Sequence, residues 1–270
     1  MKFLKYLGWA VTVLILVVVF WLLFQRPNHN RLWEEGQEKM PRIEIEKEKM
    51  KVFNYRDFDW SDDGKAEVKY FDKEFDLNNL EGTDVIISHF SDFEGLAHIF
   101  LSFRFKEGEN LVVSVETRRE ADEEFSPWLG LLRRFEIIYV AGSERDIIGV
   151  RTDIRRERVY VYPTVADKKK SQELLVLIAK DINYIYANPT FYNTLFNNCI
   201  NSITRRVEDI SEIKFPLSYK TFLPGFMDEV LYDIKLIPND KSFQKTKQFY
   251  LVNNDEVNRG DSEYSIKIRK

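Results

Sequence analysis

An uninterrupted apolar run near the N-terminus constrains this chain more than any other feature. Residues 7–24 read LGWAVTVLILVVVFWLLF, eighteen positions without a charge. About twenty apolar residues span a bilayer as a helix, and Trp near both ends suits the two membrane interfaces. A cleavable signal peptide has a shorter apolar core and small residues before its cleavage site, whereas this run ends in WLLF. We therefore expect residues 1–26 to be a retained transmembrane anchor.

Positive charges lie on both sides of this run, with Lys2 and Lys5 before it and Arg26 and Arg31 after it. They give only a slight bias toward a cytoplasmic N-terminus. Short N-terminal anchors of this kind usually export the rest of the chain. We expect a single-pass protein of a bacterial inner membrane, with the N-terminus inside and the C-terminal domain in the periplasm.

The composition argues against nucleic acid as a partner and against sites that need several cysteines. Lys and Arg total 40 against 44 Asp and Glu, a net charge of −4, and no long basic stripe occurs, so a nucleic-acid partner is not expected. The one cysteine, Cys199, excludes an intrachain disulfide and a cysteine-based zinc cluster. We expect no metal and no cofactor. Cys199 is then either an inert core residue or a nucleophile.

Hydrophobic periodicity divides the rest of the chain. We expect a polar spacer at 27–50 that contains a solvated His29, a folded domain at 51–238, and a polar tail at 239–270 with little packed structure. The predicted strands are 42–47, 65–75, 84–89, 97–105, 111–117, 135–140, a short one at 146–151, and 158–162. The predicted helices are 168–187 and a second one from 197 or 198 through 207.

Cys199 is placed to be reactive. Asn198 precedes it as a helix-capping residue, and Ile200, Ile203 and Val207 recur on one face of the helix that follows. A thiol in the first turn feels the positive end of the helix dipole, which lowers its pKa, and the backbone N–H groups there can receive an oxyanion. We therefore expect a low-pKa thiol that can be acylated.

Two further residues would complete a catalytic group. His98 alternates with Phe100 and Ser102 on one face of its strand, so it is the candidate base, whereas His89 ends a strand and suits a loop-edge role. Glu116, on the returning strand of the hairpin, would hold the imidazole. It reaches the face of His98 if the connecting loop holds an odd number of residues, and the opposite face if the number is even.

Four residues are candidates for substrate binding: Ser102, Arg118, Tyr192 and Asn198. Arg118, and Arg151 with it, could bind a phospholipid phosphate through a guanidinium fork, or belong to an ion-pair network that fixes the sheet. Tyr192 could line a pocket or pack in the core. Asn198 suits a helix cap better than a catalytic role. Ser102 shares the face of His98.

The order of these residues resembles a known arrangement. A His strand, then a carboxylate strand, then a Cys helix is the reverse of papain-like enzymes and resembles the circularly permuted NlpC/P60-type thiol fold. Five segments, with roughly residues 30–225 around them, are similar to the periplasmic domain of the Lnb-type lipoprotein N-acyltransferase family: HIFLSFRF (98–105), VSVETRRE (113–120), YVAGSERDIIGVRT (139–152), VYVYP (159–163) and PTFYNTLFNNC (189–199). We therefore expect an α+β, papain-like fold in permuted order behind one transmembrane helix.

The resemblance implies a thiol acyltransferase. Cys199 would take an acyl chain from a membrane phospholipid as a thioester and pass it to an amine, which in that family belongs to a lipoprotein. His98 would deprotonate Cys199, and Glu116 would fix the tautomer of His98. Two alternatives remain open: a periplasmic hydrolase that cleaves a peptidoglycan amide or a lipid ester with the same residues, and a non-catalytic envelope module that binds lipid or a partner.

Overall fold

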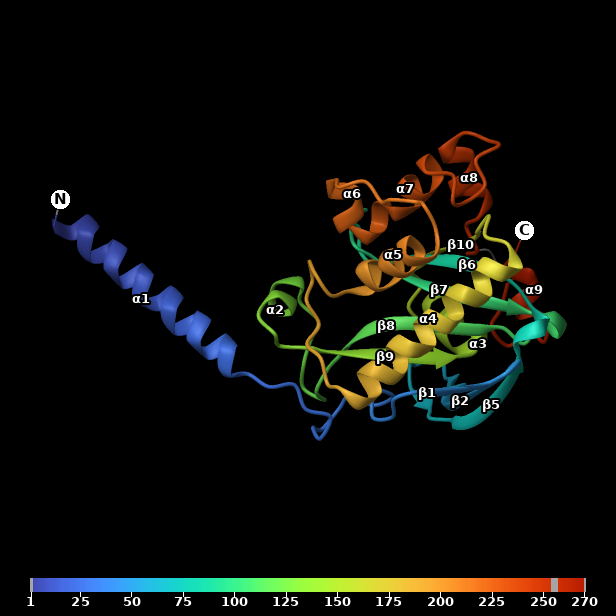
Figure 1. Ribbon diagram of the computed structural model, residues 1–270, viewed down its shortest axis with the longest axis horizontal. Helices are drawn as coiled ribbons and strands as arrows, with labels where there is room; N and C mark the ends of the chain where they lie inside the picture. Colours follow the sequence, from blue (N-terminus) through green and yellow to red (C-terminus); the bar gives the residue numbers. More distant parts are fainter. Residues whose placement is uncertain (1, 254–256, 270) are drawn as a thin grey trace.

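A computed structural model describes residues 2–253 and 257–269 of the chain (Figure 1). The helices are α1 (Lys2–Phe24), α2 (Pro127–Leu131), α3 (Glu144–Ile147), α4 (Lys168–Ala187), α5 (Cys199–Ile210), α6 (Tyr219–Phe222), α7 (Met227–Asp233), α8 (Phe243–Phe249) and α9 (Tyr264–Lys267). Short helical turns are η1 (Leu77–Asn79), η2 (Lys106–Gly108), the π-type η3 (Val150–Ile154) and η4 (Pro224–Phe226). The strands are β1 (Arg42–Glu46), β2 (Lys49–Arg56), β3 (Asp59–Trp60), β4 (Ala66–Glu67), β5 (Tyr70–Asp76), β6 (Leu80–His89), β7 (Ala97–Phe105), β8 (Leu111–Arg118), β9 (Glu136–Gly142) and β10 (Arg158–Pro163).

The predicted anchor is the helix α1, which projects away from the domain (Figure 1). None of its residues is buried, and in the described part of the chain it is the one helix long and apolar enough to cross a membrane. Its C-terminal end is linked to the domain, because Arg133 Nη1 donates to the carbonyl oxygen of Leu22 at 3.0 Å. The chain thus fits a single-pass membrane protein.

One mixed sheet forms the centre of the domain, so the expected α+β class is correct. Its strands run in the order β1-β2-β9-β8-β7-β6-β10, with β5 paired to β2. All the pairs are antiparallel except β2 with β9, which meet in parallel at Arg56 and Gly142. A side chain at position 142 would collide with the carbonyl oxygen of Arg56, so this crossing requires glycine.

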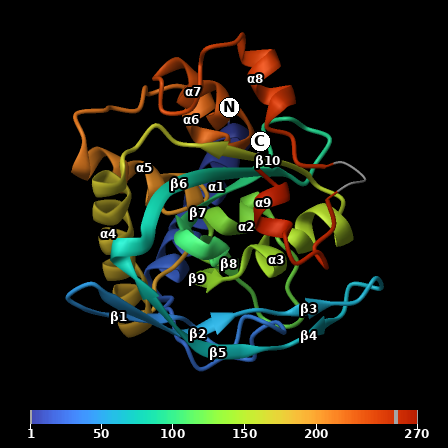
Figure 2. The ribbon, with the colours of Figure 1, turned by 90° about the vertical axis from the view of Figure 1, so that its right-hand side faces the viewer.

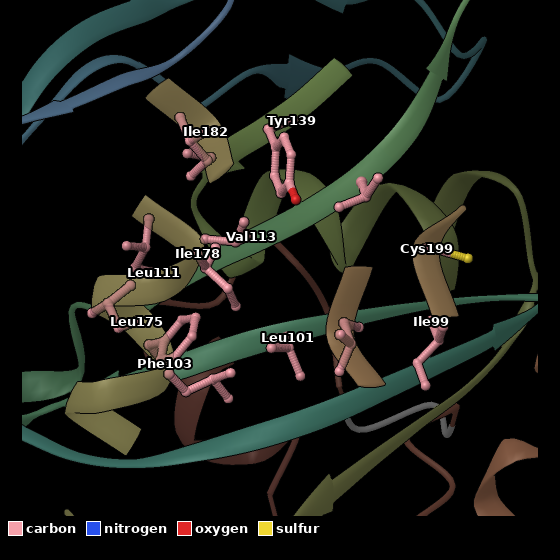
Figure 3. Packing of buried hydrophobic residues seen from close by; sticks show 14 of the residues in the cluster. Ile99, Leu101, Phe103, Leu111, Val113, Tyr139, Leu175, Ile178, Ile182 and Cys199 are labelled. Atoms are coloured by element: carbon pink, nitrogen blue, oxygen red, sulfur yellow. The ribbon is translucent and has the colours of Figure 1, made fainter. Parts of the chain in front are cut away.

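Helices cover both faces of the sheet (Figure 2). The larger core lies under α4, α5 and α7, and Ile99, Leu101 and Phe103 of β7 point into it (Figure 3). Phe100 points the other way, into a smaller core with residues of α3 and α9. Successive side chains of a strand face opposite sides of a sheet, so β7 contributes to both layers.

The two predicted helices are present. Asp167 caps α4 by accepting a hydrogen bond from the backbone N–H of Lys170, and Leu174, Ile178 and Ile182 form its buried stripe. The helix spans 168–187, as predicted. Asn198 caps α5 in the same way, accepting from the backbone N–H of Asn201, and Cys199 is its first residue.

Several expectations need correction. The strand predicted at 146–151 is helical, because Ser143 caps α3 by accepting from the backbone N–H of Asp146. The strand predicted at 65–75 is divided into β4 and β5. His29 is not simply solvated, since its Nε2 lies 3.1 Å from the carbonyl oxygen of Ile185.

The polar tail at 239–270 also packs where it is described. It forms α8 and α9, and Val252, Tyr264 and Ile268 are buried in the smaller core. Arg269 forms ion pairs with Asp84 and Glu144. These three apolar residues are widely spaced between charged ones, which is why the sequence pattern of this segment indicates a tail.

Candidate active site

The site lies where two neighbouring strands separate. β7 and β8 pair at Leu101 with Val113, Ser102 with Val112, and Phe103 with Leu111. Toward the other end, residues 97–100 of β7 continue to pair with β6, and residues 114–118 of β8 continue to pair with β9. The two strands therefore diverge there, and side chains from both faces of the sheet reach one opening.

Cys199 approaches this opening from the side of α5. It is buried beside Ile99 at the end of the larger core (Figure 3). Burial raises the pKa of the Cys199 thiol to about 11, although the backbone N–H groups of Ile99, Ile200 and Cys199 itself lower it. The expected low pKa is therefore wrong for this structure, because desolvation outweighs the helix dipole. At neutral pH the thiol keeps its proton.

His98 belongs to the opposite layer. Its ring stacks on Phe100 with the centroids 5.3 Å apart, and its Nε2 lies 2.7 Å from Ser114 Oγ. Burial and the positive charge of Arg151 lower the pKa of His98 to about 3, so the imidazole is neutral. A neutral imidazole is the form that acts as a base.

Glu116 shares the face of His98, as an odd loop requires. Seven residues, 104–110, separate the paired Phe103 and Leu111. The register differs by two residues from a pairing of Phe100 with Glu116, but the face is the same. Glu116 Oε1 lies 3.9 Å from His98 Nε2 and accepts a hydrogen bond from Ser114 Oγ at 3.0 Å.

Ser114 therefore stands between the two predicted catalytic residues. Burial opposes ionisation of Glu116, but the surrounding positive charges together outweigh it and hold the pKa of Glu116 well below its usual value. The largest of these charges is Arg151, whose Nη2 lies 3.0 Å away. An ionised carboxylate only accepts, so the Ser114 hydroxyl donates to it and must accept from His98 Nε2–H. This fixes the tautomer of His98 and leaves Nδ1 as the basic atom.

All three predicted catalytic residues line one pocket of about 1050 Å³. Its apolar lining includes Phe90, Phe125, Phe222 and Leu223, and its charged lining includes Arg56, Arg151, Arg155 and Glu157. A pocket with an apolar wall and a few polar groups suits an amphiphilic ligand. In residues 2–253 and 257–269, no group of three or more His, Cys, Asp or Glu side chains could hold a metal ion.

The sequence of this domain matches a known family. The family described as the Lnb N-terminal periplasmic domain matches residues 66–225, more than half of the chain, including Cys199, His98 and Glu116. The chain belongs to the Lnb family. No curated protein and no solved structure matches it significantly. Membership indicates a periplasmic domain with a lipoprotein-related role in the envelope.

Two of the four predicted substrate-binding residues of this Lnb domain line the pocket. Tyr192 does, and burial together with the nearby Cys199 raises the pKa of its hydroxyl well above its usual value. Asn198 also lines it, but its amide is engaged, because Oδ1 accepts from Asn201 N at 3.0 Å and Nδ2 donates to the carbonyl oxygen of Thr194 at 2.6 Å. The capping role is therefore the correct one for its side chain.

The structure places the other two elsewhere. Ser102 is fully buried and donates to Glu144, which pairs with Arg269, so no substrate reaches it. Arg118 is also buried, and it donates to the carbonyl oxygens of Gln37 at 2.9 Å and Glu38 at 2.8 Å. Burial lowers the pKa of Arg118 to about 10. Its role is to fasten the spacer to the sheet, and binding of a phosphate is not expected there.

Sequence reasoning missed Ser114 and underrated Arg151. Ser114 lies two residues before Glu116 on the same strand, so it shares the face of Glu116 and His98, and this alternation was a usable signal. The sequence indicates Arg151 only as one of several charged residues that could bind a phosphate or form an ion-pair network. Its specific place beside Glu116 depends on the π-type turn η3, which no sequence pattern here predicts.

Proposed function

We propose that this Lnb-family chain is a membrane-anchored cysteine acyltransferase that works through an acyl-thioester at Cys199. The single observation that carries the proposal is the chain of contacts from His98 through Ser114 to Glu116, in the same pocket as a thiol at a helix N-terminus. This is the nucleophile, base and orienting group that covalent acyl transfer needs. A membrane phospholipid is the proposed acyl donor, and a lipoprotein amine is the proposed acceptor.

In the first half-reaction, Sγ of Cys199 attacks the carbonyl carbon of a lipid ester. Because the resting thiol is protonated and the imidazole is neutral, the proton passes to His98 Nδ1 as the S–C bond forms. The oxyanion that develops would lie at the first-turn N–H groups of α5. The C–O bond of the ester then breaks, and the leaving alkoxide takes the proton from Nδ1.

In the second half-reaction, an amine attacks the thioester carbonyl. His98 Nδ1 accepts a proton from the attacking nitrogen and returns it to the sulfur as the C–S bond breaks. The products are an amide and the free thiol of Cys199. Throughout, the Ser114 hydroxyl and the Glu116 carboxylate hold His98 in one tautomer and oppose its rotation.

The type of fold and the orientation of α1 in the membrane are part of the same proposal. The order of β7, β8 and α5 along the chain supports a papain-like, NlpC/P60-like thiol fold in permuted order. A cytoplasmic N-terminus for α1 would place the catalytic pocket in the periplasm, in agreement with the family assignment.

The proposal is tested by intact-mass analysis of the full-length protein extracted from membranes. We expect a fatty-acyl adduct on the wild type that hydroxylamine removes, and none on Cys199→Ala. Added phospholipid vesicles with an amine acceptor should convert the adduct to acyl-amine. The absence of any adduct in both proteins, with lipid present and the fold intact, would contradict the acyltransferase proposal and leave the binding module and the peptidoglycan amidase as alternatives.

The hydrolase alternative has its own outcome in this experiment. Release of free fatty acid at the same rate with and without amine would mean that water is the acceptor. Cleavage of peptidoglycan fragments without any reaction on phospholipid would replace the acyltransferase proposal with the amidase alternative.

A further inference from the structure

Apolar side chains are exposed on and next to the chain segments that line the pocket. We define the apolar rim as Phe90, Phe93, Trp128, Phe196, Leu217 and Tyr219. Among them Leu217 is 90% exposed, Trp128 is 77% and Phe196 is 68%. A soluble monomer rarely gathers so much apolar surface in one region unless that region binds something.

The rim is built from four chain segments that contact one another. Thr194 Oγ1 donates to the carbonyl oxygen of Pro127 at 2.7 Å, which joins the segment before α5 to α2. The rings of Phe90 and Phe125 are 6.5 Å apart, which joins the loop after β6 to the segment before α2. The backbone N–H of Gly225 donates to the carbonyl oxygen of Gly95 at 3.2 Å, which joins that loop to η4 beside α6.

The rim is continuous with the interior of the pocket. Phe90 belongs to both, and Phe125, Phe222 and Leu223 line the pocket directly behind the segments that carry the rim. An acyl chain could therefore pass from the rim to the pocket along apolar side chains, without crossing water.

The position of α1 identifies what covers the rim. Arg133, just after α2, donates to the carbonyl oxygen of Leu22 in the last turns of α1, so α2 lies at the end of the membrane helix. Figure 1 shows α2 and α6 on the side of the domain from which α1 projects. A surface next to the end of a membrane helix faces the bilayer, and aromatic side chains are favoured at the membrane interface.

We propose that the apolar rim inserts into the interface of the bilayer that α1 spans, so that the pocket of Cys199 opens directly onto the lipid phase. The occupant of this surface is thus a lipid bilayer. The inference concerns the surface alone, and it holds whether or not Cys199 is acylated. It adds a second membrane contact to the anchor, and this contact sets the orientation of the domain.

The test uses the full-length protein in nanodiscs of phosphatidylcholine and phosphatidylglycerol. Single cysteines at Trp128→Cys, Phe196→Cys and Leu217→Cys, each in a Cys199→Ser background, carry an environment-sensitive fluorophore. Ile266→Cys is the matched control, since Ile266 is 67% exposed and lies on α9, away from α1. Melting temperatures that match that of the unlabelled protein establish that each labelled variant is folded.

We expect doxyl-labelled lipids to quench the three rim labels severalfold more than the control label, and iodide in the buffer to quench them severalfold less. Iodide quenching of all folded rim variants equal to that at position 266 would place the rim in water and overturn the proposal. Protection from both quenchers would also overturn it, because a second copy or a protein partner would then cover the rim. The three positions are independent, so one misfolded variant leaves the test intact.

Discussion

At Cys199 two opposing effects act on one thiol. Three backbone N–H groups, including that of Ile99 on β7, favour the thiolate, while burial favours the neutral thiol and prevails. Glu116 adds a negative charge nearby that acts in the same direction as burial. The thiol is thus protonated at rest, and in the proposed mechanism it becomes a nucleophile only as His98 receives its proton.

Alkylation of Cys199 should therefore depend steeply on pH. A thiol with a pKa of about 11 is protonated at pH 7, so its thiolate fraction, and the rate of reaction with iodoacetamide, should rise about tenfold per pH unit from pH 7 to 10. An ordinary thiol reaches a plateau just above its pKa of about 8.5. The rate is measured by mass spectrometry on the folded protein. A plateau below pH 9 would mean that the thiol is less buried than described.

In the proposed mechanism Ser114 is a positioning residue rather than a catalytic one, since it would act through His98. Ser114→Ala removes the acceptor of Nε2–H and frees the imidazole to change tautomer. We expect the acylation of Cys199 to be roughly 10- to 100-fold slower. This is part of the rate acceleration that a positioned base supplies. The apparent pKa of the base in the pH–rate profile should also move, because the link to Glu116 is lost.

Ser102→Ala is the matched control for this variant. Ser102 also donates to a buried carboxylate, that of Glu144, but it lies outside the pocket. We expect its acylation rate per folded molecule to equal that of the wild type. An equal loss in both variants would show that the effect of Ser114 is on the fold and not on His98.

At the scale of elements, the start of α5 determines where Cys199 lies. The Oδ1 of Asn198 accepts a hydrogen bond from the backbone N–H of Asn201, and its Nδ2 donates to the carbonyl oxygen of Thr194. One side chain therefore fixes both the start of the helix and the segment before it. The divergence of β7 and β8 provides the opening opposite this helix end. The site thus depends on the end of one helix and the separation of two strands.

Removal of this cap should weaken the domain and slow the chemistry together. For Asn198→Ala we expect a loss of about 1 kcal/mol in the free energy of unfolding. Asn198→Ser keeps a capping oxygen and should recover most of the stability. Thermal unfolding in detergent, followed by near-ultraviolet circular dichroism, measures the difference. Equal melting temperatures for Asn198→Ala and Asn198→Ser would contradict a capping role.

At the scale of the whole molecule, Arg269, the last described residue, forms ion pairs with distant parts of the chain. Arg269 pairs with Asp84 on β6 and with Glu144 on α3, and both carboxylates are about 1% exposed. These contacts join the C-terminal segment to the central sheet. A buried carboxylate without its partner is costly, so the end of the chain takes part in the stability of the domain.

Arg269→Ala should therefore destabilise the protein strongly. Glu144 loses its ion-pair partner and Asp84 keeps only Arg104, at 3.0 Å. We expect a loss of about 3–5 kcal/mol in the free energy of unfolding, typical of breaking a buried ion pair. Arg42→Ala is the control, since Arg42 pairs with Glu44 at the surface, and its loss should stay below about 1 kcal/mol. Similar losses in the two variants would show that the C-terminal pair is not effectively buried.

Local patterns in the sequence determined a large part of this structure. The apolar run predicts α1, the 3.6-residue period predicts α4, and the capping Asn198 predicts the start of α5, because each depends on neighbours within a few residues. The alternation along 97–105 and 111–117 offers Glu116 as a partner of His98, but only the register of β7 and β8, with seven residues between the paired ends, places it on the same face. The three residues of the proposal can therefore be named from the sequence, whereas the common face of His98 and Glu116 was decided by the structure.

Tertiary structure alone decided the pKa values in the site and the contacts between segments far apart in the sequence. The pKa of Cys199 depends on how completely α5 is buried against β7. The pKa of His98 depends first on its burial and then on Arg151, which is brought there by η3. The inward orientation of Arg118 and the packing of the tail likewise join distant segments, through contacts between residues 81 and 185 positions apart. Desolvation and charge–charge effects sum over all neighbours in space, whereas a sequence pattern reports only neighbours along the chain.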